Sequence, residues 1–177
     1  MAQNIEPDKC KITRYPEKVL AGKAKPIEEI NDDIHKLVEK MTDLMIEHRG
    51  VGFAAPQAGV GLRLFIISLD GTRENVRVYI NPTVTTHGSL ETNEEGCLSI
   101  PQVYTKVKRF SKASVTATDL NGRKFTEEGE GLYARALQHE FDHIEGITIA
   151  DRMGSAARIV HRRQLKKLAE QYKKSAQ

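Results

Sequence analysis

The sequence has no apolar run long enough to cross a bilayer. Its first residues, Met1 to Pro16, lack the apolar core of a secretory signal and are not the arginine-rich, acid-poor stretch of a transit peptide. Internal repeats, low-complexity tracts and long linkers are missing as well. We therefore expect a single cytoplasmic domain spanning residues 1–177, long enough to enclose a hydrophobic core, and no membrane partner.

Cysteine is scarce, since only Cys10 and Cys97 occur. Because disulfides are rare in cytosolic proteins, each thiol needs its own explanation. Cys10 lies in a polar N-terminal segment, and we interpret it as incidental. Cys97 stands before a short apolar stretch, which suits a buried structural thiol. The same residue also has the chemistry of a metal ligand.

The formal net charge of +3 conceals an uneven distribution. From Arg152 to Gln177 there are eight basic residues and one acidic residue, whereas residues 1–151 hold 19 basic and 23 acidic residues. A basic tail on a mildly acidic body is typical either of a solvated helix face or of a tail that contacts an anionic partner. The sequence leaves both interpretations open.

Helical periodicity appears at both ends of the chain. An amphipathic helix is predicted after Asn31, a suitable N-cap, with its apolar residues at helical spacing: Ile34, Leu37, Val38, Met41, Leu44 and Met45. A second helix is expected over about 132–143, with Gly146 as its stop. A third, basic helix is predicted over about 155–172, with a thin apolar stripe.

Strand patterns occupy the middle of the chain. Residues 64–69, 76–80, 114–118 and 124–126 are predicted to be strands, and Asn121-Gly122 between the last two is a strong hairpin signal. No regular alternation of strands and helices appears, so the order of elements predicts an α+β fold.

Residues 139–143 read HEFDH and match the pattern H-E-x-x-H. On a helix His139 and His143 project from the same face, so both imidazoles can bind one metal ion. Glu140 cannot join them without distortion, but it can take a proton from a water that the metal holds. The alternative is a polar helix with two surface histidines. Leu132 and Ala136 share the histidine face, and we therefore expect that face to be buried.

A catalytic site needs a third protein ligand and one open position. Downstream, where zinc proteases supply that ligand, the chain has Ile149 and Arg163, and neither side chain can bind the metal. Upstream, Cys97 offers a thiolate, and we predict that it completes the set. Zinc and ferrous iron both suit a Cys–His–His site, and residue types alone do not choose. The predicted architecture is antiparallel or mixed β-sheets packed around the central metal-binding HExxH helix, with an N-terminal amphipathic helix and a C-terminal basic helix.

Three separated motifs together resemble those of bacterial peptide deformylases, in the same order and spacing. They are Gly50 to Gln57 (GVGFAAPQ), Glu95 to Ser99 (EGCLS) and Gln138 to His143 (QHEFDH). The resemblance extends from about Ile12 to the C-terminal helix. It implies a metal-dependent hydrolase that releases formate from the N-terminal formylmethionine of newly synthesised polypeptides.

The resemblance further implies which residues hold the metal and move the proton. Cys97, His139 and His143 would bind one divalent ion per chain, commonly Fe²⁺, with Zn²⁺ or Ni²⁺ able to substitute. A metal-bound water would be the nucleophile. Glu140 would act as its general base and would later protonate the leaving amine.

By the same resemblance, Gln57 and the backbone N–H of Leu98 would donate hydrogen bonds to the developing oxyanion. Such donors are worth roughly 3 kcal/mol each in comparable sites. Gly52 and Gly96 would pair with the substrate backbone as if adding a strand. Glycine lets another backbone approach closely.

The chain departs from the family pattern at two pocket positions. Tyr104 and Arg135 stand where some relatives have an arginine and an aliphatic residue, and both are expected to border the pocket for the methionine side chain. Side-chain preference therefore does not follow from the resemblance. Arg109 is predicted to pair with Glu95 behind the metal loop.

The expected partners are N-formylmethionyl nascent peptides, and no DNA partner is expected. Some deformylases dock on the ribosome through a C-terminal helix, so the basic helix here is a candidate for contact with ribosomal RNA phosphates.

Two rival interpretations share the histidine pair. An HExxH metalloendopeptidase would cleave internal peptide bonds, but Cys97 and Gln57 argue against it. A non-catalytic protein could use Cys97, His139 and His143 to hold structural zinc, although structural sites normally close with a fourth protein ligand.

Overall fold

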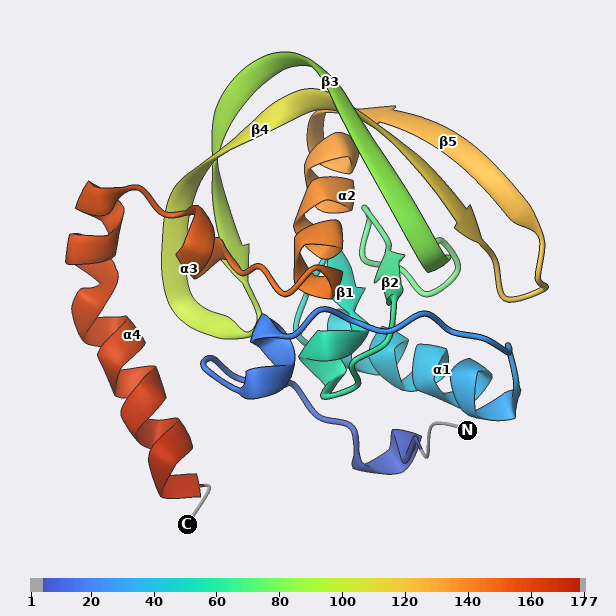
Figure 1. The fold of residues 1–177 in the computed structure, drawn as a ribbon, viewed down its shortest axis with the longest axis horizontal. Helices are drawn as coiled ribbons and strands as arrows, with labels where there is room; N and C mark the ends of the chain where they lie inside the picture. Colours follow the sequence, from blue (N-terminus) through green and yellow to red (C-terminus); the bar gives the residue numbers. More distant parts are fainter. Residues whose placement is uncertain (1–4, 176–177) are drawn as a thin grey trace.

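A strongly curved, antiparallel sheet of five strands wraps around helix α2 (Gly131–Ile144) in the computed structural model, which describes residues 5–175 (Figure 1). The strands follow one another in sequence order across the sheet: β1 (Gly52–Ala54), β2 (Leu64–Ile67), β3 (Arg77–Cys97), β4 (Ile100–Thr118) and β5 (Lys124–Glu130). Every neighbouring pair is antiparallel, so of the two sheet types expected the antiparallel one is found.

Strands β3 and β4 are much longer than predicted, at 21 and 19 residues. They form a ribbon that arches over α2, and bulges near residues 80–83 and 87–90 help to bend it (Figure 1). Between 86 and 94 every residue of β3 except Asn93 is exposed, so the alternation of apolar and polar residues that marks a half-buried strand is missing. The sequence prediction therefore found only the start of β3 and the end of β4, which pair with each other at one end of the ribbon. The predicted Asn121-Gly122 hairpin joins β4 to β5.

Helix α1 (Asp32–Glu47) forms where the periodicity predicts it. The Asn31 side chain caps it by accepting a 3.2 Å hydrogen bond from the backbone N–H of Ile34. All six apolar residues of the predicted stripe are buried, and they pack with β2 and the loop that follows β1. This core holds the loop beside the site in place.

Helix α2 ends as predicted near Gly146, which has a φ of 78°. A Cβ at this position would lie 2.8 Å from the carbonyl oxygen of Ala21, so the close chain approach requires glycine as well. Ala136 and His143 are buried, but Leu132, predicted to be buried on the same face, is 46% exposed. The face is covered only toward its C-terminal end, because its first turn borders an open pocket.

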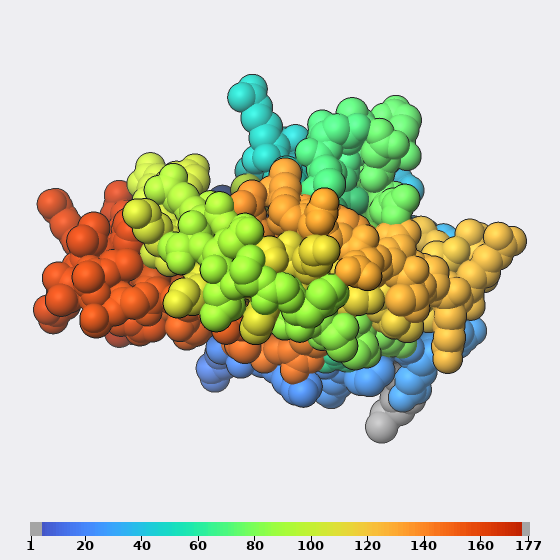
Figure 2. Space-filling model, turned by 90° about the horizontal axis from the view of Figure 1, so that it is seen from above, coloured from blue at the N-terminus to red at the C-terminus, as the bar shows by residue number. Residues whose placement is uncertain are grey.

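The chain ends in two further helices, α3 (Ile149–Arg152) and α4 (Ser155–Ser175). Three short 3₁₀ turns complete the described elements: η1 (Pro7–Lys9), η2 (Lys18–Ala21) and η3 (Ala55–Ala58). Leu168 of α4 is buried against a small cluster that includes Ile100 and Val103 of β4, while most of the helix is exposed. Figure 2 shows α4 as a lobe at one end of the molecule. Among residues 5–175, no helix combines the length and apolarity that a membrane span requires.

Candidate metal centre

Helix α2 and the end of β3 bring three ligand atoms together. The Nε2 atoms of His139 and His143 are 3.2 Å apart, and the Cys97 Sγ lies 3.3 Å from the His143 Nε2. All three ligand atoms lie within 4.8 Å of one another. Atoms bound to one ion at about 2.0–2.3 Å with tetrahedral angles lie about 3.3–3.8 Å apart. The spacing therefore fits a divalent metal held by one thiolate and two imidazoles.

Glu95 fixes the orientation of the His139 ring from the side that faces away from the other two ligands. The ring Nδ1 lies 2.9 Å from the Oε2 of Glu95, which leaves Nε2 facing the other two ligands. Burial alone would raise the pKa of Glu95, but hydrogen bonds from His139 and Arg109 outweigh it and lower that pKa to about 2. Glu95 is therefore ionised and holds the imidazole as a carboxylate does behind a metal-bound histidine.

Arg109 connects this carboxylate to the helix, as predicted for its pairing with Glu95. Its Nε and Nη2 donate to the two oxygens of Glu95 at 2.6 and 2.9 Å, and its Nη1 donates to Asp142 at 2.8 Å. The Arg109 side chain is only 4% exposed. Asp142 also accepts from Arg152, so each buried charge in this group has an opposite partner.

Cys97 lies at the tight turn that joins β3 to β4, where it pairs with Ile100. Burial opposes ionisation of its thiol, but His143 and His139 outweigh burial and lower the pKa of Cys97 well below its ordinary value. The thiolate is the form that binds metals. Cys97 is thus suited to the role of third ligand, and it does not pair with Cys10.

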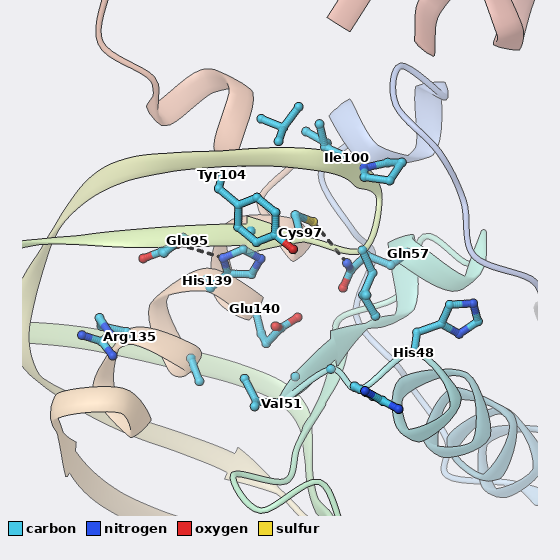
Figure 3. Close-up of a pocket in the computed structure, with 18 of the residues that line it drawn as sticks. His48, Val51, Gln57, Glu95, Cys97, Ile100, Tyr104, Arg135, His139 and Glu140 are labelled. Atoms are coloured by element: carbon cyan, nitrogen blue, oxygen red, sulfur yellow. Dashed lines mark hydrogen bonds and ion pairs between the residues drawn. The ribbon is translucent and has the colours of Figure 1, made fainter. Parts of the chain in front are cut away.

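Gln57 faces the same atoms from the opposite side of the pocket (Figure 3). Its Oε1 accepts a 2.8 Å hydrogen bond from the backbone N–H of Ala54, which fixes the amide orientation. The Nε2 consequently points toward the centre and lies 3.5 Å from the Cys97 Sγ. An amide N–H is thereby presented beside the ligands.

Glu140 is 4% exposed, and its Oε2 has no hydrogen-bond partner in the described part of the chain. Burial raises the pKa of Glu140 to about 7. A Cβ on Gly52 would lie 2.4 Å from the Oε1 of Glu140, so the glycine makes room for this carboxylate. An unpaired buried carboxyl beside a metal site has the position that a proton carrier needs.

A pocket of about 520 Å³ opens onto these residues (Figure 3). Nine of the ten residues singled out from the sequence line it: Gly52, Gln57, Gly96, Cys97, Leu98, Tyr104, Arg135, His139 and Glu140. His143, the tenth, lies deeper and is 1% exposed. The ring of Tyr104 covers Gly96, since a Cβ there would lie 2.8 Å from a ring carbon, and Tyr104 itself is 63% exposed.

The sequence reasoning missed several residues that also line the pocket, among them Arg14, His48 and Val51. Arg14 donates a hydrogen bond from its Nη1 to the carbonyl oxygen of Leu98. The two residues are 84 positions apart in the chain, and no local pattern signals such a contact. Val51, by contrast, stands inside the GVGFAAPQ motif and could have been found there.

Known proteins share much of this sequence. A sequence model of the family described as "Polypeptide deformylase" matches residues 9–158. The chain is 41% identical over 157 residues to a peptide deformylase of Thermodesulfovibrio yellowstonii, covering 88% of this chain and 95% of that relative. It is 42% identical over 142 residues to a peptide deformylase of Neisseria gonorrhoeae, covering 80% of this chain and 85% of that relative.

Solved structures give the same result for the fold. The crystal structure of a peptide deformylase from Legionella pneumophila superposes with a TM-score of 0.86 at 39% identity, covering 92% of this chain and 96% of that chain. A peptide deformylase from Plasmodium falciparum superposes with a TM-score of 0.90 at 32% identity, covering 94% of this chain and 99% of that chain. The chain therefore belongs to the polypeptide deformylase family of metal-dependent hydrolases.

Proposed function

We propose that this protein removes the formyl group from the N-terminal formylmethionine of nascent polypeptides, using one divalent ion held by Cys97, His139 and His143. The observation that carries the proposal is the convergence of these ligands with Glu140 and Gln57 at one end of an open pocket. When bound, the ion supplies a nucleophile at neutral pH by acidifying water, and it polarises the carbonyl group under attack.

In the proposed mechanism, Glu140 moves the proton. Its buried and unpaired carboxyl group accepts a proton as the nucleophile forms and returns it to the methionine amine as formate leaves. Gly52 leaves the space in which this carboxyl group sits. The same residue can thus serve first as base and then as acid without leaving the pocket.

Gln57 and Leu98 stabilise the charge that develops on the formyl oxygen. The Gln57 Nε2 is already aimed at the centre by the bond from Ala54, so little reorganisation is needed during the reaction. The backbone N–H of Leu98 is the second donor. Gly96, at the exposed end of β3, and Gly52 in β1 bind the extended substrate backbone, with Tyr104 and Arg135 beside its methionine side chain.

The first experiment compares three peptides. Formate release from formyl-Met-Ala-Ser supports deformylation, with acetyl-Met-Ala-Ser as a matched substrate that should stay intact. Cleavage of an internal bond in a longer unformylated peptide, without formate release from the first, would instead support the metalloendopeptidase alternative.

We propose Fe²⁺ as the native ion, as the resemblance to the family implies. A thiolate and two imidazoles also suit Zn²⁺ and Ni²⁺, so either should be able to replace it. Anaerobic purification followed by metal analysis tests this. Activity that is lost in air and restored by Fe²⁺ with a reductant is the expected result, whereas an air-stable zinc protein with full activity would contradict it.

We further propose that the protein acts in the cytoplasm and contacts the ribosome through α4. Seven basic residues of this helix are exposed: Arg158, Arg162, Arg163, Lys166, Lys167, Lys173 and Lys174. Contacts with RNA phosphates weaken steeply as salt rises. Co-sedimentation with ribosomes should therefore be present at low salt, and replacing four of these residues (162, 163, 166 and 167) by Gln should abolish it. Undiminished co-sedimentation of that variant would refute the contact.

A further inference from the structure

Three consecutive N-terminal residues lie across the two loops that line one side of the metal centre. The backbone N–H of Thr13 donates to the carbonyl oxygen of Gln57 at 2.7 Å, and that of Tyr15 donates to the carbonyl oxygen of Ser99 at 3.0 Å. Between them, the side chain of Arg14 donates to the carbonyl oxygen of Leu98. One short segment therefore contacts both the loop of Gln57 and the turn after Cys97.

These two loops come from distant parts of the sheet. Gln57 belongs to η3 after β1, whereas Leu98 belongs to the turn between β3 and β4, and β1 and β3 are not neighbours in the sheet. No direct pairing of the two strands therefore sets the distance between the two proposed oxyanion donors, since β2 lies between β1 and β3. Segment 13–15 is hydrogen-bonded to both loops and can set it.

Arg14 is suited to this task by its own surroundings. Its side chain is half-buried and lines the pocket, and within residues 5–175 its guanidinium forms no ion pair. The charge is directed instead at a main-chain carbonyl of the turn, and a hydrogen bond with a charged donor is about twice as strong as a neutral one. The Leu98 carbonyl lies in the planar peptide group that follows Leu98, and its N–H lies in the one that precedes it. Fixing the Leu98 and Ser99 carbonyl oxygens therefore restricts the Leu98 N–H through the φ and ψ angles of Leu98.

We propose that Arg14 is a positioning residue for deformylation, which fixes the backbone of Leu98 so that its N–H and the Gln57 amide point at the same oxygen. This inference rests on the proposed function of the site. Arg14 touches neither the metal ligands nor the reacting atoms. Its effect is exerted through Leu98 and falls on the transition state, because the charge on the formyl oxygen is largest there.

The test compares Arg14→Met, which keeps much of the apolar stem and removes the donors, with Arg14→Lys, which restores one charged donor. Arg123→Met is the matched control, since Arg123 is exposed in the turn between β4 and β5 and does not line the pocket. For each variant, kcat and KM for formyl-Met-Ala-Ser, bound metal and the unfolding temperature are measured.

Arg14→Met is expected to lower kcat about tenfold or more while KM stays within about twofold, as for loss of an interaction made mainly in the transition state. Metal content and unfolding temperature should match the wild type. Arg14→Lys should recover part of the lost kcat, and Arg123→Met should behave as the wild type.

The proposal is overturned if Arg14→Met turns over at the wild-type rate, or if its lost turnover is matched by lost metal or lost stability. It is also overturned if the loss appears in KM alone. These outcomes differ from failure of the proposed function, in which the wild-type protein itself would release no formate.

Discussion

The metal centre and helix α4 both concentrate charged side chains, but they hold them in opposite ways. Around the metal centre, Glu95, Arg109 and Asp142 are at most 9% exposed and each has a partner of opposite charge. On α4, the basic residues point into solvent, and Lys166 has only a distant partner in Glu170, at 3.8 Å. Buried charges must be paired and are costly to disturb, whereas exposed charges contribute little to stability and remain free to attract a partner.

The largest effect should follow removal of a proposed metal ligand from the buried region. Cys97→Ala leaves only the two imidazoles, so metal content should fall sharply and formate release should fall to background. Cys10→Ala is the matched control, because Cys10 lies far from the ligands in sequence and packs near α1. Retention of a full metal complement by Cys97→Ala would contradict the predicted ligand set.

A large effect on rate alone is expected when Glu140 is replaced. Glu140→Ala removes the proton carrier but no ligand, so kcat should fall by about 10²–10⁴-fold while metal content is unchanged. Glu74→Ala, at an exposed carboxylate between β2 and β3, should leave the rate as it is. The assignment would be wrong if Glu140→Ala retained more than a tenth of the wild-type kcat.

The comparison of buried and exposed charges can be tested with two arginines that each bridge two acids. Arg109 bridges Glu95 and Asp142 at 4% exposure, and Arg73 bridges Glu39 and Asp43 at 47% exposure. Arg109→Met leaves buried charges unpaired and should lower the free energy of unfolding by about 3–5 kcal/mol. Arg73→Met should cost less than about 1 kcal/mol.

Chemical denaturation of the two variants measures the free energy of unfolding that each one loses. Equal losses of stability would show that burial does not govern the strength of these ion pairs and would remove the contrast between the two regions.

The smallest effect on chemistry should come from α4. Replacing Arg162, Arg163, Lys166 and Lys167 by Gln should leave kcat and KM for a short formyl peptide within about twofold of the wild type, because none of the four lines the pocket. A tenfold loss of activity on the short peptide would mean that the helix takes part in catalysis as well.

Much of the site could be predicted because most of its residues belong to short sequence motifs. His139 and His143 were predicted as ligands from their spacing on one helix. Cys97 was added because the downstream positions hold no residue that could bind the metal. The structure brings these three residues together. Asn31 and the apolar period likewise predicted α1. The histidine pair and α1 were predicted from residues close in sequence, whereas Cys97 followed from eliminating the downstream ligands.

What could not be predicted depends on contacts between distant segments. The middle of β3 lacks a buried face, so apolar and polar residues do not alternate there. In β4 the buried face includes polar side chains such as Thr105 and Arg109, which hides its alternation from the sequence. Leu132 follows the helical period of α2 yet is exposed. Which turns of the helix are buried depends on the segments that pack on it, and these are distant in sequence. The contact of Arg14 with Leu98 has the same origin.

One consequence of the ligand arrangement concerns the order in which the chain matures. Cys97 and His143 are separated by 46 positions, with β4, β5 and most of α2 between them. During synthesis the sulfur is therefore available long before the second imidazole, and a loaded centre can form only after α2 has docked inside the arch. Metal uptake should thus report completed folding. Removing the metal with a chelator should release the link that closes the long loop between Cys97 and His143.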